Sequence, residues 1–246
     1  MKKNAMLKIA AILLVAVLLT TCAISSTFAK YTAGTGDETT AQVAKWGVVA
    51  SVSLDNLFSN TYESDTSGYT TDTVTSADST GATLLVAPGT KGSLDLTSTF
   101  SGQPEVAVEV KIVPEFVVTG FTAAGATYCP VVFFVNGKVI GFSGMKYTAA
   151  DGTVKAVGTG DVVATSITDL QDKVLAELNS LDGTAGENGT KYAPNEKDFS
   201  ELVSTFNFGW EWAFTGNNDT NDSLLGDTHS ANTIYLKLTP SITQID

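Results

Sequence analysis

The densest group of side chains that could bind an ion lies near the C-terminal end, in residues 217–227. Carboxylate and amide oxygens are the ligands that Ca²⁺ prefers, and the segment supplies four candidates: Asp219, Asn221, Asp222 and Asp227. The spacing of an EF-hand is not kept, because Leu224 stands where the loop glycine belongs and Ser230 where the bidentate glutamate belongs. Runs of Asn and Asp also form solvated turns. The segment is predicted to be a polar loop, with calcium binding as the weaker alternative.

Nucleophilic catalysis would need a cysteine or a serine beside a base. Cys129 is flanked by Tyr128 and an apolar run, which is typical of a small buried core residue. The only histidine, His229, lies in a polar segment with no local relation to that cysteine. The glutamates are scattered, and the sequence contains no HExxH or GxSxG motif and no phosphate-binding glycine loop after a strand. We therefore expect no enzymatic activity and no cofactor, and keep a hydrolase only as a third hypothesis.

Residues 205–214 alternate between aromatic and smaller or polar residues. The aromatic positions are Phe206, Phe208, Trp210, Trp212 and Phe214. An exposed aromatic face could stack on carbohydrate, but strict alternation is typical of a strand that turns one face into the core. The core position is the favoured interpretation, and a carbohydrate platform is its alternative.

The charge balance excludes one large class of partners. The chain has 26 acidic against 14 basic residues, a net charge of −12, and it contains no arginine. Binding to nucleic acid needs a basic surface that displaces counterions from phosphates. No nucleic-acid partner is expected. Thr, Ser, Gly, Val and Ala dominate the composition. The β-branched residues favour strands and Gly, Asn, Asp and Ser favour the turns between them, which is typical of an all-β extracellular domain.

The N-terminus predicts export. Residues 1–29 combine a lysine-bearing tip with an apolar run over residues 9–24, which is too short to span a bilayer as a helix. Small residues precede a predicted cleavage after Ala29, which would leave Lys30 as the first residue. The alternatives are an uncleaved anchor and a lipoprotein modified at Cys22. We expect a secreted or cell-surface protein that touches the membrane only through its signal peptide before cleavage. Cys129 then has no intrachain disulfide partner.

After a flexible lead over residues 30–42, residues 43–246 are predicted to form a single antiparallel β-sandwich domain of eight to ten strands. Strands are predicted at 43–54, 83–86, 92–100, 106–118, 205–214 and 230–245. A hairpin is predicted over residues 128–142, because Asn136-Gly137 suits a type I′ turn. One helix is predicted over residues 167–181, where apolar residues recur at helical spacing and Ser166 and Asp169 resemble a capping pair. This helix is expected to pack across one end of the sandwich.

Three stretches resemble the secreted TasA/camelysin family of Gram-positive bacteria. They are the signal end at residues 26–29 with the strand entry at 41–48, the strand and Pro-Gly turn at 83–91, and the strand at 233–239. The resemblance implies a jelly-roll sandwich that is displayed outside the cell and polymerises into matrix fibres, with the N-terminal segment of one subunit completing the sheet of the next. Camelysin is also described as a metal-dependent protease, but no zinc motif here matches that role.

We therefore expect a secreted structural subunit of biofilm-type fibres that associates with itself and with other matrix or cell-surface components. A free strand that adds to a sheet edge gains main-chain hydrogen bonds, and residues 40–49 would be the donor, with Val43, Trp46 and Val48 as assembly residues. The alternative is a monomeric surface adhesin or binding module for carbohydrate or calcium.

Overall fold

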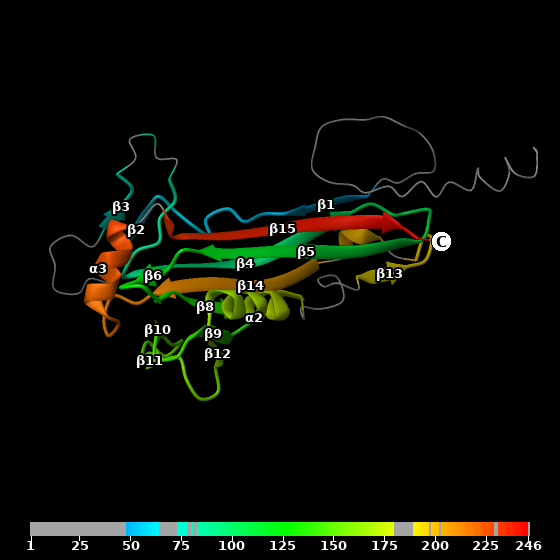
Figure 1. The fold of residues 1–246 in the computed structure, drawn as a ribbon. Helices are drawn as coiled ribbons and strands as arrows, with labels where there is room; N and C mark the ends of the chain where they lie inside the picture. Colours follow the sequence, from blue (N-terminus) through cyan, green and yellow to red (C-terminus); the bar gives the residue numbers. More distant parts are fainter. Residues whose placement is uncertain are drawn as a thin grey trace, which may run out of the picture. The chain divides into compact units, whose positions relative to one another are not determined.

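Two pairs of long antiparallel strands form the centre of the fold (Figure 1). Strand β5 (Val108–Thr119) pairs with β15 (Thr233–Gln244) along its whole length. Strand β4 (Thr90–Ser101) pairs in the same way with β14 (Val203–Trp212). The computed structural model describes residues 48–63, 73–77, 80, 83–179, 189–196, 198–201, 203–228 and 231–245, all within one compact unit.

Each pair belongs to a larger sheet. A six-stranded sheet has the order β1-β4-β14-β8-β9-β12, and a three-stranded sheet has the order β13-β5-β15. The further strands are β1 (Val49–Val52), β8 (Val132–Val135), β9 (Lys138–Phe142), β12 (Val162–Ala164) and β13 (Thr190–Tyr192). All of these pairings are antiparallel except that of β12 with β9, which is parallel. The expectation of a wholly antiparallel sandwich is wrong at this edge, where the chain passes through another hairpin between the two strands.

Three small ladders lie outside the two sheets: β2 (Thr61–Glu63) with β3 (Thr73–Thr75), β6 (Thr122–Ala123) with β7 (Ala126–Thr127), and β10 (Lys146–Thr148) with β11 (Val154–Ala156). The described chain is thus an all-β protein with several sheets and two α-helices. None of the described helices is long and apolar enough to cross a membrane.

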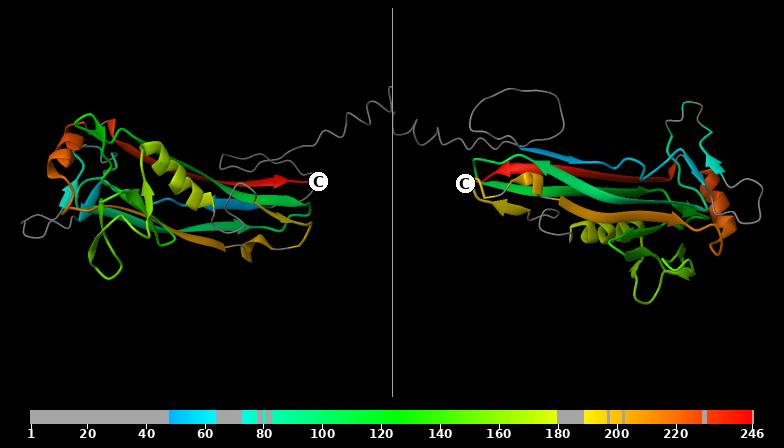
Figure 2. Two further views of the ribbon diagram at one scale, coloured as in Figure 1. Left: turned by 60° about the horizontal axis from the view of Figure 1, so that its bottom comes forward. Right: turned by 180° about the vertical axis from the view of Figure 1, so that it is seen from behind.

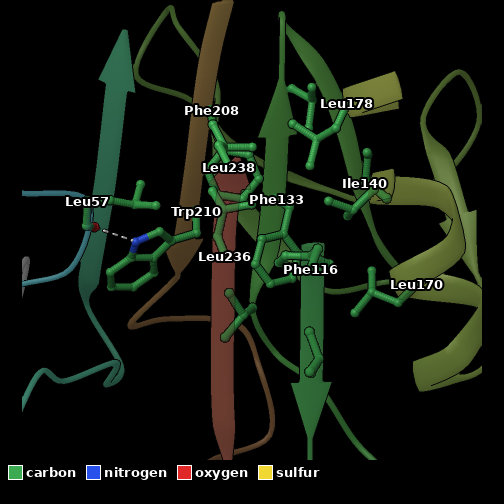
Figure 3. Packing of buried hydrophobic residues seen from close by; sticks show 14 of the residues in the cluster. Leu57, Phe116, Phe133, Ile140, Leu170, Leu178, Phe208, Trp210, Leu236 and Leu238 are labelled. Carbon is green, nitrogen blue, oxygen red and sulfur yellow. Dashed lines mark hydrogen bonds between the residues drawn. The ribbon is translucent and has the colours of Figure 1, made fainter. Parts of the chain in front are cut away.

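The two sheets face each other across an aromatic core (Figure 3). The ring of Phe116, from β5, lies 5.0 Å from Phe133 and 6.2 Å from Phe208, which belong to the six-stranded sheet. Along β5 buried and more exposed residues alternate, as the two-residue period of a strand requires. Trp210 adds the largest fully buried side chain, and its Nε1 donates to the carbonyl of Leu57 at 2.9 Å.

The predicted helix is confirmed as α2 (Ile167–Asn179), and residues 180–188 lie outside the described part. Its start is capped as expected, because the Asp169 N–H donates to Ser166 Oγ at 3.1 Å. Leu170, Val174 and Leu178 are fully buried. The helix packs on β5, β8, β9 and β12 (Figure 2). Gln171 accepts a hydrogen bond from the Val118 N–H, so α2 covers an edge of β5 that no strand occupies there.

The predicted hairpin is also confirmed, as β8 and β9. Asn136 has φ 47° and Gly137 has φ 79°, the two positive values that a type I′ turn requires. The strands predicted near residues 92–100, 106–118, 205–214 and 230–245 correspond to β4, β5, β14 and β15.

Two local predictions are wrong. Residues 217–227 are not a loop but contain a second helix, α3 (Asp219–Asp227). Asn218 caps this helix by accepting from the Asn221 N–H, and the acidic residues of the first turn suit the positive end of the helix dipole. The short strand predicted at 83–86 is reduced to one bridge between Ser59 and Leu85. A short 3₁₀ helix, η1 (Phe199–Glu201), precedes β14.

Candidate functional site

Most of the predicted processing and assembly positions lie outside the described residues. These are the signal peptide (1–29), the lead (30–42), and the residues Ala29, Lys30, Val43 and Trp46. Val48 is described, and its side chain is only 7% exposed and packed in the main core. The first described residue of the predicted donor is therefore held inside its own subunit.

Strand β1 follows Val48 and lies at the end of the six-stranded sheet. Among the described strands its four residues pair with β4, from Val49 opposite Ser101 to Val52 opposite Ser98. The faces of β1 alternate as predicted, since Val49 is 64% exposed while Ala50 and Val52 are half-buried against the core. A short edge strand with few buried side chains is the kind of element that separates at low cost.

An apolar groove continues from the end of β1. It is a cavity of about 460 Å³ between the Leu54–Phe58 region and the first half of β15, where Leu84, Ile234 and Leu236 form much of the wall. Tyr235 and Leu84 are both exposed large side chains here. In the described sheets β15 pairs only with β5, and β1 packs beside it without pairing.

The four calcium candidates, Asp219, Asn221, Asp222 and Asp227, all lie on α3. Asp219 and Asp227 are its first and last residues, which at 1.5 Å per residue separates them by roughly 12 Å along the helix axis. Within the described residues no group of three or more His, Cys, Asp or Glu side chains is arranged to hold a metal ion. The helix therefore does not bring these oxygens to one point.

Asp222 belongs to a different cluster, which it forms with Tyr128 and Trp212. Tyr128 Oη donates to Asp222 Oδ1 at 2.6 Å and accepts from the Asn218 N–H at 3.2 Å. Burial is the largest influence on the Asp222 carboxyl and raises its pKa. The negative charge of Asp219 also raises this pKa, whereas the hydroxyl of Tyr128 and the indole of Trp212 lower it. Burial and the contact with Asp222 likewise raise the pKa of the Tyr128 phenol.

The cluster borders a cavity of about 700 Å³. Its walls come from the 83–88 segment, the end of β14, α3 and the start of β15. Phe58, Leu84, Phe121, Leu225 and Ile234 supply apolar surface, and Trp212 and Asp222 supply polar groups. Trp212 is 5% exposed, and its Nε1 has no hydrogen-bond partner of ordinary geometry among the described residues.

The strand with alternating aromatic residues fills the core as predicted at Phe208, Trp210 and Trp212, which are buried. Phe214 lies beyond the end of β14 and is only half-buried. The alternation predicts that the residues on the opposite face of this strand are exposed to solvent, but this is not so at Glu211. Glu211 is also buried and accepts from the backbone N–H and the hydroxyl of Thr148 at 2.9 and 2.7 Å. Cys129 is buried as predicted, and His229 lies outside the described residues.

Sequence reasoning missed the Tyr128–Asp222–Trp212 cluster. The local pattern presents Tyr128 as a neighbour of the buried Cys129, and Trp212 as a core residue or part of a carbohydrate platform. Tyr128 and Asp222 are 94 positions apart, and no local spacing predicts that they meet. Comparison with protein-family models, with characterised proteins and with solved structures found no match.

Proposed function

We propose that this chain is a secreted structural subunit that assembles into extracellular fibres by exchanging its N-terminal strand between subunits. The observation that carries the proposal is strand β1: a four-residue strand at the end of the described six-stranded sheet, paired there with β4, that follows the segment predicted to be freed by cleavage after Ala29. The similarity of residues 26–29, 41–48 and 83–91 to the TasA/camelysin family supports the same function and a jelly-roll topology.

The energetics of β1 permit exchange between subunits. Burying the side chain of Val48 stabilises the strand by roughly 1.5–3 kcal/mol, and each ladder hydrogen bond adds a net of about 0.5–1.5 kcal/mol. The same contacts form again when strand β1 of a neighbouring subunit takes the vacated place. The total stabilisation from burial and hydrogen bonding therefore changes little on exchange. A head-to-tail contact that does not close on itself then extends into a filament. Other matrix or cell-surface components would bind along such a filament.

The test compares two chains, one beginning at Lys30 and one beginning at Ser53, which lacks β1. The Lys30 chain is expected to form filaments in negative-stain microscopy. The Ser53 chain is expected not to, and to bind a synthetic peptide of residues 43–54 in fluorescence anisotropy. A Lys30 chain that stays monodisperse at high concentration, with and without calcium, would refute the proposal.

The peptide offers a matched pair of controls. Val48→Asp places a charge on the buried side of the strand, whereas Val49→Asp places the same charge on the side that is 64% exposed. Strand insertion predicts that the first change abolishes peptide binding and that the second leaves it within a few fold. Equal losses would mean that the peptide binds by charge rather than by strand pairing.

A further inference from the structure

The cavity beside α3 combines an apolar interior with an uncompensated carboxylate. At about 700 Å³ it falls within the range of small-molecule sites. It lies at the end of the sandwich where β14 ends and β15 begins, next to α3 and β6 (Figures 1 and 2). Its apolar walls would bury the hydrocarbon part of a ligand.

Asp222 lacks a cationic partner in the described part of the chain. The ion pairs found there join Lys138 of β9 to Glu177 of α2, and Lys173 to Asp169 within α2, and none of these residues lines the cavity. The hydroxyl of Tyr128 is a neutral donor and leaves the carboxylate charge in place. A partly buried charge is stabilised best by an opposite charge that reaches it in the same low-dielectric surroundings.

Trp212 supplies a second feature of the same wall. Its indole lies near enough to Asp222 to lower the pKa of that carboxyl, but Nε1 is buried without a partner that meets hydrogen-bond geometry among the described residues, and Trp212 lines the same cavity. Buried polar atoms of this kind are rare in folded proteins and call for an explanation. A ligand atom that accepts a hydrogen bond would satisfy this N–H.

We propose that this cavity binds a small organic amine: an ammonium group paired with Asp222, an apolar body against Phe58, Leu225 and Ile234, and an acceptor oxygen within reach of Trp212 Nε1. Because Asp219 adds a second negative charge nearby, anionic ligands of the same size would be repelled. The proposal does not rest on the fibre function proposed above, although the cavity shares Phe58, Leu84 and Ile234 with the groove that continues from the end of β1.

The test uses the chain from Lys30, which contains every residue that the structure describes, and three probes of similar size. 4-Methoxyphenethylamine is cationic, 2-(4-methoxyphenyl)ethanol is neutral and 3-(4-methoxyphenyl)propionate is anionic at neutral pH, and all three carry the same ether oxygen as an acceptor. Calorimetry is expected to rank their affinities in that order, with the amine at least tenfold tighter than the alcohol. Equal affinity for amine and alcohol, or no binding of the amine at millimolar concentration, would overturn the proposal.

Two variants separate the site from general charge effects. Asp222→Asn removes the carboxylate of the cavity, and Asp227→Asn removes one from the same helix outside the cavity lining. Asp222→Asn is expected to lower the affinity for the amine at least tenfold, and Asp227→Asn is expected to lower it less than twofold. Equal losses in the two variants would contradict the assignment of Asp222.

A measurement on the unaltered chain keeps the proposal testable if Asp222→Asn does not fold. Amine binding is expected to shift the indole N–H resonance of Trp212 in a ¹⁵N correlation spectrum. It should leave that of Trp210 in place, because Trp210 already donates to Leu57. Saturating amine that moves neither resonance, or both equally, would place the binding elsewhere.

Discussion

A disulfide between β1 and β4 tests strand exchange most directly. Val49 and Ser101 lie directly opposite each other in the antiparallel register, and both are exposed, so changing them disturbs little of the core. Directly paired residues of antiparallel strands have Cα atoms about 4.5 or 5.5 Å apart, and both separations fall within the range that a disulfide bridges. The double variant Val49→Cys, Ser101→Cys is therefore expected to oxidise without backbone movement.

The expected stabilisation follows from the length of chain that the disulfide closes. Closing a loop of about 50 residues lowers the entropy of the unfolded chain enough to stabilise the fold by roughly 4 kcal/mol. For a domain of this size that corresponds to a rise in Tm of about 8–16 °C. The more informative consequence is that an oxidised subunit cannot release β1 to a neighbour.

The assay is sedimentation velocity with negative-stain microscopy on the oxidised double variant, before and after reduction. The oxidised protein is expected to remain monomeric with a raised Tm, and reduction is expected to start filament growth. Each single cysteine variant serves as a control for the substitution itself. Filaments that grow equally fast from the oxidised and reduced forms would refute the release of β1, whatever else drives assembly.

Three further predictions test the core that holds β1 and the cavity in place. Burial raises the pKa of the Cys129 thiol to about 12, so native protein should resist thiol reagents at pH 8. The unfolded thiol ionises near pH 8.5; the urea midpoint should therefore fall as pH rises above that value, and Cys129→Ala should lack this part of the fall. Gly92→Ala would bring a Cβ into the Leu57 carbonyl and to 2.6 Å from Trp210 Nε1. The loss of that buried hydrogen bond should cost about 1–3 kcal/mol in urea unfolding; an unchanged midpoint would contradict the packing. Leu170→Ala in α2 should cost about 2–5 kcal/mol, and a cost below 1 kcal/mol would mean that the helix is not part of the core.

Local patterns predicted those elements whose structure depends on local chemistry. The Asn136-Gly137 turn needs two residues that tolerate positive φ. Because these two residues are adjacent in the sequence, their types alone are enough to predict the turn. The stripe that includes Leu170 and Val174 predicts both the helix and its buried face. The alternation in β5 likewise predicts which of its side chains face the core.

Local patterns gave a wrong prediction for residues 217–227. Asn218 and the acidic residues after it predict a turn, whereas in the structure they cap and begin α3. Asn and Asp favour both turns and helix starts, because in both their side chains accept hydrogen bonds from nearby backbone N–H groups. The contact of Leu225 with the core distinguishes the two cases here, and a nine-residue helix needs such tertiary packing to be stable.

The sequence by itself determined the all-β class, the hairpin, the position of α2, the burial of Cys129 and the acidic net charge. Only the tertiary structure decided which strands are neighbours, that β1 occupies an edge, and that Tyr128, Trp212 and Asp222 meet at one cavity. The physical reason is the range of the interactions. Turn, cap and alternation chemistry acts between residues a few positions apart. Sheet order and the cavity instead depend on contacts between segments that come together only when the two sheets pack.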